Sequence, residues 1–489
     1  FSFKICHNHI YTTDGLQKQP AFFELLKIIF CKIEDERNVP HELEFFATAS
    51  EKSSPDGRLT VKRRINKIFS RVKSKYSAIF PSNDEVNLEP RSLAYIVGEL
   101  QRYGFLNTGI DVKGKAYEEI VGANLRGDRG EFFTPRNIQR MAIDMLSPKS
   151  GEKILDPACG TGGFLVIAMN DIIEQVRGQG SHLGDAYAEA LRDQIREIAS
   201  TSFFGFDINP DLVKATKMNM VMNNDGSGNI YRADSLRHPH QWPTDFRESL
   251  AKAVGVNTSE FRNVDDLSHF DLIATNPPFG SKLPIKDADT LRQYELGHVW
   301  EKQQGDWWAK KDKLMSSQPP EILFVERCYQ LLKPDGRLAI VLPDAILGAP
   351  GLGYVRQWIL SNFRVVASVD LHPDAFQPRN GTQTSVLILQ KKNAEEKRRE
   401  ERQNQLYDYE IFMAQNRAIG HDKRGNKVFM RNNDGEELYF DSSDVVELAR
   451  TASNEATTRP MPRQKVLDDD TPEIAKSFVS WKRQVVLGW

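Results

Sequence analysis

The sequence predicts an α/β fold in which helices cover both faces of a mainly parallel sheet. Two observations predict it. Seven short apolar segments rich in β-prone residues alternate with segments of helical periodicity between residues 153 and 389, as in a doubly wound sheet. Polar side chains follow several of these segments, and ligands bind at the carboxyl ends of strands in such sheets. The expected strands cover residues 153–156, 203–207, 229–233, 271–275, 337–342, 365–371 and 384–389.

The segments on either side of the expected sheet have a different character. Before about residue 110 the apolar side chains recur at helical spacing, as in Phe22, Leu26 and Ile29, which predicts an N-terminal helical domain. After residue 391 the strand pattern gives way to mixed charges, which is typical of a solvated extension. A chain of 489 residues is long enough for two or three domains. We therefore expect domains at residues 1–114, 115–392 and 393–489.

The net charge and its distribution argue against a protein whose main role is to coat nucleic acid. The net charge of −2 is not that of a protein that coats nucleic acid, so any DNA contact would need a local basic patch. Residues 59–76 contain several lysines and arginines and no acidic residue. Such a stretch is equally consistent with a solvated helix face and with a contact to the phosphate backbone of nucleic acid.

The cysteines and the apolar runs predict a cytoplasmic protein. The four cysteines lie far apart, as is usual in a reducing compartment. No apolar run approaches the ~18 residues of a membrane span. The chain starts at Phe1 rather than at a methionine and stops at Trp489 just after an apolar run, so we expect a continuation beyond Trp489.

The stretch from Asn276 to Phe279 is the centre of the expected site. An apolar strand runs into Pro277 and Pro278, neither of which can donate to a sheet ladder. The strand therefore ends with a side-chain amide, a backbone carbonyl and an aromatic ring. These groups suit an exocyclic base amine, which needs two acceptors for its N–H groups and a surface on which its ring can stack. Alternatively, the stretch is a proline-rich loop after a buried strand.

A second motif lies where the first strand leads into a helix. The strand ends in Asp156, and a turn containing Gly160, Thr161 and Gly162 opens the helix. Glycines let the backbone approach a ligand closely at a helix amino terminus. A dinucleotide fingerprint would need its third glycine at Leu165, so a nicotinamide site is disfavoured.

Polar residues recur at the ends of four strands, namely Asp156, Asp207, Asp234 and Asn276. Each acid alone is more often a helix cap or a turn residue. Because the carboxyl ends of parallel strands meet at one edge of the sheet, the four together predict a shared site. A carboxylate at Asp207 can accept both hydroxyls of a ribose.

Together these residues, and the run from Gly122 to Pro135, resemble the N6-adenine DNA methyltransferases, most closely the modification subunits of type I restriction-modification systems. The resemblance covers roughly residues 10–440 and implies a Rossmann-like, seven-stranded methyltransferase sheet. It implies S-adenosylmethionine as methyl donor and a flipped adenine of double-stranded DNA as acceptor. The donor contacts that it implies are Glu131, Phe132, Phe133, Thr134, Pro135, Gly160, Thr161 and Gly162, with Asp156, Asp207, Ile208 and Asp234, and the catalytic residues are Asn276, Pro277, Pro278 and Phe279.

The resemblance also implies partners. In the family, site selection lies in a specificity subunit and cleavage in a restriction subunit, and this chain has no ATP-binding lysine loop of its own. An insertion between residues 172 and 201 departs from the family pattern near Asp207. Because the expected strands are complete by Leu389, we expect truncation after that residue to remove the partner and to spare the donor site.

Two rival functions stay open at this point. An RNA base or a glutamine side chain of a protein could replace adenine, since both amines need the same two acceptors. A non-catalytic architectural subunit that only binds DNA and partners is the other rival, against which the intact donor turn and Asn276 argue.

Overall fold

The computed structural model describes residues 2–37, 43–105, 117, 133–179, 185–224, 228–257, 261–280, 284–305, 307–378, 380–403, 405–440, 445–448, 457–460 and 465–485. The chain groups into two compact units. The first comprises Phe1–Gly127, Lys217–Asn223 and Asn432–Val466, and the second comprises Asp128–Thr216, Asn224–Arg431 and Leu467–Trp489. The division into three domains at residues 114 and 392 stays a prediction.

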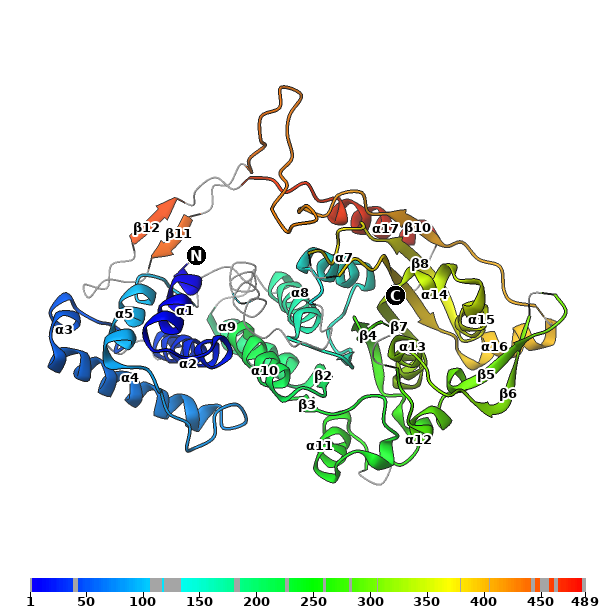
Figure 1. Ribbon diagram of the computed structural model, residues 1–489, viewed down its shortest axis with the longest axis horizontal. Helices are drawn as coiled ribbons and strands as arrows, with labels where there is room; N and C mark the ends of the chain where they lie inside the picture. The colour runs from blue at the N-terminus through cyan, green and yellow to red at the C-terminus, as the bar shows by residue number, and fades with distance from the viewer. Residues whose placement is uncertain are drawn as a thin grey trace. The chain divides into compact units, whose positions relative to one another are not determined.

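The first unit is mainly helical, as expected from its periodicity (Figure 1). Phe22, Leu26 and Ile29 of its second helix are fully buried, so the recurring apolar side chains do form its core. A short antiparallel ladder joins β11 and β12. The elements are α1 (Ser2–Thr13), α2 (Lys18–Arg37), α3 (Ala49–Ser53), α4 (Pro55–Lys75), α5 (Pro90–Leu100), β11 (Val445–Leu448) and β12 (Thr457–Pro460).

The basic stretch at residues 59–76 lies on α4, and much of its charge is used within the unit. Arg64 pairs with Glu51 at 2.9 Å. Lys67 and Arg71 both pair with Glu44, at 2.8 and 2.6 Å. Of the two interpretations that the sequence left open, this pairing favours a structural helix face.

The second unit is built on a sheet with the strand order β10–β8–β9–β7–β4–β1–β2–β3. All neighbouring pairs are parallel except those of β9, which runs antiparallel to β7 and β8. All seven expected segments are strands of this sheet, which confirms the predicted fold class. The strands are β1 (Ile154–Asp156), β2 (Phe203–Asp207), β3 (Ile230–Arg232), β4 (Phe270–Thr275), β7 (Leu332–Pro343), β8 (Phe363–Asp370), β9 (Thr384–Lys391) and β10 (Phe412–Gln415).

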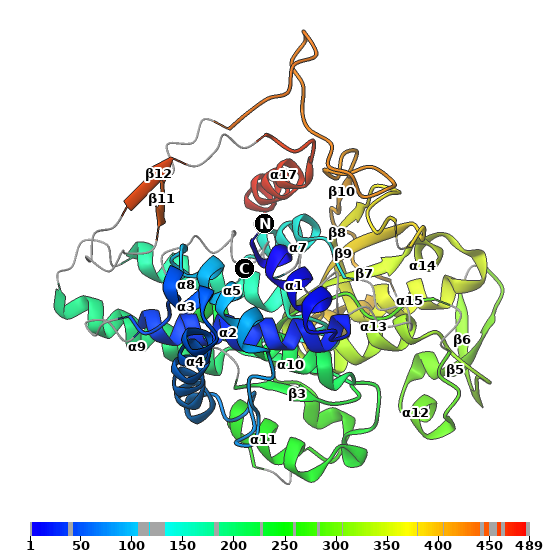
Figure 2. The same ribbon diagram turned by 60° about the vertical axis from the view of Figure 1, so that its left-hand side comes forward.

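Helices cover both faces of this sheet (Figures 1 and 2). On one face, alternate side chains of β7 (Leu338, Ile340 and Leu342) pack with apolar stripes of α11, α13 and α15. The helices α7 and α8 pack on β1, β4 and β7 from the other face. The helices of this unit are α7 (Arg136–Leu146), α8 (Gly163–Gln179), α9 (Asp185–Thr201), α11 (Thr244–Val254), α12 (Ala288–Arg292), α13 (Pro320–Leu331), α14 (Asp344–Gly348), α15 (Gly353–Asn362), α16 (Ala394–Gln403) and α17 (Thr471–Gln484). Helix α10 (Pro210–Asn224) begins in this unit, and its residues Lys217–Asn223 group with the first unit.

Strand β1 lies at the point where the chain changes direction across the sheet. Its neighbours are β2 on one side and β4 on the other, so the loops after these strands leave the same edge in opposite directions. Ligands of doubly wound sheets bind at such a switch point. The ends of β1, β2 and β4 carry Asp156, Asp207 and Asn276 respectively.

The sheet extends beyond Leu389, and on this point the sequence-based expectation is wrong. Strand β10 adds an eighth strand beside β8, because its backbone pairs with a strand edge that would otherwise be open. Phe412 of β10 then packs on Phe478 and Trp481 of α17, with ring centroids at 5.4 and 5.7 Å. Strand β10 and helix α17 are therefore part of the α/β unit.

An antiparallel hairpin that the sequence did not suggest follows the Asn276–Phe279 stretch. It comprises β5 (His298–Lys302) and β6 (Trp308–Leu314). Trp300 and Trp308 pack on Tyr354 of α15, with centroids at 6.0 and 5.9 Å. In the described part of the chain, no helix is both long and apolar enough to cross a bilayer.

Candidate active site

The turn after β1 is shaped by two glycines. Gly160 and Gly162 have φ angles of 53° and 79°, a region in which a side chain is strained. A Cβ at Gly162 would also lie 2.7 Å from Thr216 Cγ2. Thr216 in turn donates from Oγ1 to the Gly160 carbonyl at 2.7 Å. The turn is therefore fixed in shape before α8 begins at Gly163.

Asp156 lies at the floor of the site with 2% of its surface exposed. Its Oδ1 accepts the Ala158 N–H at 3.0 Å. Burial raises the pKa of Asp156 to about 7, and the charge of Asp207 adds to that rise. A carboxyl group with such a pKa changes its protonation state near neutral pH.

Asp207 is tied to the glycine turn, which brings two of the predicted motifs together. Its Oδ2 accepts the Gly160 N–H at 3.0 Å and its Oδ1 accepts the Asn209 N–H at 2.8 Å. The neighbouring Ile208 is an apolar side chain with 63% of its surface exposed. The end of β2 thus offers a carboxylate and an apolar surface side by side, although the insertion at α9 precedes it.

Asp234 follows β3 and lies in a tightly held loop. Its Oδ1 accepts the Leu236 N–H at 3.1 Å, and its backbone carbonyl accepts from Trp242 Nε1 at 3.0 Å. Ser235 donates to the Pro157 carbonyl, which joins this loop to the residues that follow β1.

Asn276, at the end of β4, has one half of its amide occupied and the other half without a partner. Its Nδ2 donates to Thr134 Oγ1 at 2.9 Å. Its Oδ1 is buried and accepts no hydrogen bond. Because Thr134 holds the NH₂ group, the amide is oriented with its acceptor oxygen available to a donor.

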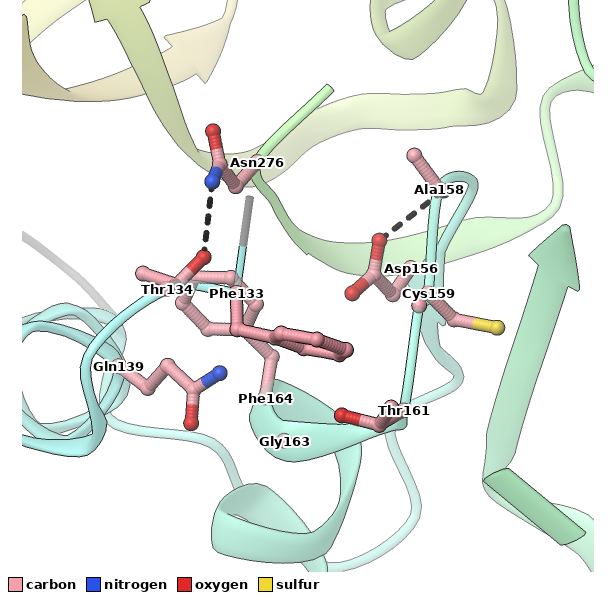
Figure 3. Close-up of a pocket in the computed structure, with 11 residues that line it drawn as sticks. Phe133, Thr134, Gln139, Asp156, Ala158, Cys159, Thr161, Gly163, Phe164 and Asn276 are labelled. Carbon is pink, nitrogen blue, oxygen red and sulfur yellow. Dashed lines mark hydrogen bonds between the residues drawn. The ribbon is translucent and has the colours of Figure 1, made fainter. Parts of the chain in front are cut away.

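These elements enclose one pocket (Figure 3). Six of the predicted residues line it, from the segment before α7, from β1, from its turn and from β4. The lining residues are Phe133, Thr134, Asp156, Gly160, Thr161 and Asn276, with Gln139, Ala158, Cys159, Gly163 and Phe164. Burial raises the pKa of Cys159 well above its usual value, which agrees with a turn residue rather than a nucleophile.

Other predicted residues are not among those that line the pocket. Pro135 is the N-cap residue of α7. Pro277 is buried and Pro278 is exposed. The ring of Phe279, 8% exposed, meets Phe376 edge to face with centroids at 5.9 Å. Gly162, Asp207, Ile208 and Asp234 lie in the adjoining turns, and Glu131 and Phe132 fall outside the described residues.

Five of the lining residues were not among the predicted site residues. Ala158, Cys159 and Gly163 belong to the stretch around the glycine turn, whereas Gln139 and Phe164 lie on helices. Gln139 lies on the buried face of α7 together with Ala142, Ile143 and Leu146. A glutamine within an apolar helical stripe is an unusual choice for a core position, and that departure was the available signal. Phe164 follows the glycine turn directly and carried no comparable signal.

The fold and this pocket define a Rossmann-like methyltransferase domain, in which a glycine turn follows β1 and an Asn-Pro-Pro-Phe motif follows β4. A crystal structure of the methyltransferase subunit of a type I restriction-modification system from Streptococcus thermophilus has the same fold. It superposes with a TM-score of 0.51 at 17% identity, over 81% of this chain and 85% of that one.

The chain belongs to the N-6 DNA methylase family, whose sequence profile matches residues 108–456. It is 25% identical over 282 residues to the methylase subunit of the type I restriction enzyme EcoEI from Escherichia coli, which is 57% of this chain and 46% of that protein. It is 32% identical over 280 residues to the HindI methylase subunit from Haemophilus influenzae, which is 54% of this chain and 48% of that protein. The chain thus spans about half the length of the curated relatives that it matches.

Proposed function

We propose that this chain transfers a methyl group from S-adenosylmethionine to the N6 amine of an adenine in DNA. The observation that carries this proposal is the Asn276 amide. Thr134 holds its Nδ2, and its buried Oδ1 has no partner. An unpaired buried acceptor costs about 1–3 kcal/mol, so its retention at a strand end beside a pocket indicates a substrate that donates to it.

The residues around the pocket fit the donor. When bound, S-adenosylmethionine supplies an electrophilic methyl group on a sulfonium centre. The carboxylate of Asp207 would accept the ribose hydroxyls, since a carboxylate has about four acceptor positions. Ile208 would contact the adenine ring of the donor and Asp234 would accept from its amine. The glycine turn and the segment from Glu131 to Pro135 would enclose the remainder.

The acceptor chemistry follows from Asn276 and Pro277. The lone pair of an adenine amine is delocalised into the ring, which makes the amine a poor nucleophile. When the Asn276 Oδ1 and the Pro277 carbonyl accept its two N–H groups, the nitrogen can pyramidalise and its lone pair becomes available. Alignment with the methyl group then supplies much of the remaining rate.

The target base must leave the duplex to reach this position. Phe279 is the surface on which we expect the extruded adenine to stack, because Phe376 fixes its ring edge-on from behind. Stacking of this kind offsets part of the cost of unpairing the base.

We further propose that the chain is the modification subunit of a type I restriction-modification complex that acts against phage DNA in the cytoplasm. The relatives named above are methylase subunits of type I restriction enzymes. The chain has a net charge of −2, and the pairing of Arg64, Lys67 and Arg71 with acids of the same unit reduces the basic surface that α4 can offer to DNA. A separate specificity subunit would supply that surface, and a restriction subunit would supply cleavage.

The test is the identity of the methylated product. Full-length chain and its specificity subunit are incubated with labelled S-adenosylmethionine and with DNA, RNA or protein, and digests are analysed by mass spectrometry. We expect the wild-type chain to form N6-methyladenine in DNA. Asn276→Ala should form none, and Asn66→Ala, a change at an exposed position, should form as much as the wild type. Label in an RNA base or a glutamine side chain would contradict DNA as the acceptor. No transfer to any acceptor would favour an architectural subunit.

A further inference from the structure

Gln139 is a polar side chain in the wall of the pocket, and its amide oxygen has no hydrogen-bond partner. It lies on α7, is 7% exposed, and lines the pocket beside Phe133 and Gly163 (Figure 3). Its Oε1 is buried and accepts no hydrogen bond. A buried acceptor without a donor lowers stability, so this oxygen needs an explanation other than packing.

The amide of Gln139 lies directly against the amino terminus of α8. A Cβ at Gly163 would lie 2.2 Å from Gln139 Nε2 and 2.4 Å from Oε1, so a side chain there would displace the amide of Gln139 from its present position. The helical ladder begins with the Val166 N–H, which donates to the Gly162 carbonyl at 2.9 Å. The N–H groups of residues 163–165 therefore have no acceptor within the helix.

Gln139 Oε1, which accepts no hydrogen bond, thus lies on the residue that packs against the first turn of α8. The N–H groups of that turn have no acceptor within the helix. A helix amino terminus attracts a carboxylate, and an amide oxygen accepts from an ammonium group. An amino acid carries an ammonium and a carboxylate group on one carbon. It could therefore donate to Gln139 Oε1 and accept from the N–H groups of the first turn of α8 at the same time.

We propose that Gln139 and the first turn of α8 bind the zwitterionic amino-acid end of the methyl donor. Gln139 Oε1 accepts from the α-ammonium group, and the N–H groups of the first turn donate to the α-carboxylate. This inference rests on the proposed function, because it takes S-adenosylmethionine as the ligand. The sulfonium has three substituents. If Asn276 faces the methyl group and Asp207 holds the adenosyl group, as proposed above, the wall at Gln139 would be left for the third.

If Gln139 had a purely structural role, replacing it would lower the stability of the unliganded chain. A role in ligand binding predicts the opposite. The neighbours of Gln139 on its helix face are apolar, so leucine or methionine would suit this position without a ligand. Replacing the glutamine should therefore leave the unliganded chain as stable as before, or more stable, while weakening donor binding. Such a trade of stability for binding is typical of functional sites.

The experiment compares two ligands that differ only at the end in question. Calorimetry with the full chain measures binding of S-adenosylhomocysteine, which carries the amino-acid end, and of 5′-methylthioadenosine, which lacks it. The variants are Gln139→Leu and Gln139→Met. Gln194→Leu makes the same change at an exposed position of α9 outside the pocket and is the control. Thermal unfolding of each unliganded variant is recorded in parallel.

We expect Gln139→Leu and Gln139→Met to lower the affinity for S-adenosylhomocysteine at least tenfold and to change the affinity for 5′-methylthioadenosine by less than twofold. Neither variant should lower the unfolding temperature of the unliganded chain. Equal weakening of both ligands, or unchanged binding of S-adenosylhomocysteine by both variants, would overturn the role of Gln139 and leave the proposed function intact. A wild-type chain that binds neither ligand would instead overturn the proposed donor, and this inference with it.

Discussion

Asn137 donates from Nδ2 to Asp469 Oδ2 at 3.1 Å, a hydrogen bond that joins residues 332 positions apart in the chain. The same amide group donates to the Ile419 carbonyl at 3.1 Å. At the other end of α7, Lys482 of α17 donates to Ser147 Oγ at 3.0 Å. Residues of the α/β unit that lie after Leu389 therefore hold α7, the helix that carries Gln139 to the pocket wall.

The first prediction corrects the expectation that the chain can be cut after Leu389 without harm to the donor site. Removing β10 and α17 would expose the side of α7 on which α17 packs and would remove the partner of Asn137 at Asp469. We expect the shortened chain to unfold at a lower temperature and to bind S-adenosylhomocysteine at least tenfold more weakly. Calorimetry and thermal unfolding measure both. A shortened chain that binds the ligand as the full chain does would show that α7 needs no support from α17.

The second prediction concerns the ribose ligand. Asp207→Ala removes charge-assisted hydrogen bonds worth ~1.5–3 kcal/mol each, so donor affinity should fall at least tenfold. The matched control is Asp193→Ala, which removes an acid that is 71% exposed in a surface ion pair and should change nothing. Unchanged affinity of Asp207→Ala in calorimetry would rule out Asp207 as the ribose ligand.

The third prediction follows from the raised pKa of Asp156. Because its folded-state pKa of about 7 lies above the unfolded value, its contribution to stability is fully present below the unfolded pKa, near 3.9. That contribution is lost as the pH rises through about 7. Asp156→Asn should therefore lose less stability than the wild type between pH 4 and pH 8. Urea unfolding at several pH values measures the two slopes, and parallel slopes would contradict a buried, protonatable Asp156.

Local sequence signals were sufficient for most of the sheet and for four residues that line the pocket, Asp156, Gly160, Thr161 and Asn276, whereas Phe133 and Thr134 came from the family resemblance. Each of the seven expected strands is an apolar run bounded by turn residues, and a polar strand end next to a glycine or proline motif can be recognised without any tertiary information. The pocket therefore brings together residues that were predicted separately, such as Asp156 and Asn276.

The parts that were missed depend on contacts distant in sequence. Strand β10 has only four residues, of which none is fully buried, and it becomes a strand by pairing with β8. The packing of α17 on α7 joins the two ends of the α/β unit and leaves no local pattern. The orientation of Asn276 depends on Thr134, which lies 142 residues away.

The fourth prediction concerns the partner. With a net charge of −2 and α4 paired internally, the isolated chain should bind S-adenosylhomocysteine but methylate DNA poorly. Addition of the specificity subunit should restore methylation at a defined bipartite sequence, which modification-sensitive sequencing of genomic DNA would reveal. Efficient and sequence-specific methylation by the chain alone would mean that it carries its own DNA-reading surface.

The central claim, that the Asn276 amide oxygen activates the target amine, is tested most directly by measuring donor affinity and methyl transfer on the same Asn276→Ala preparation. Single-turnover transfer to a DNA duplex is recorded in the presence of the specificity subunit, and S-adenosylhomocysteine binding is recorded by calorimetry. We predict a binding constant within about twofold of the wild type and a transfer rate reduced by roughly three orders of magnitude, as for loss of one preorganised group at the reacting centre. Near-normal transfer by Asn276→Ala would contradict the claim.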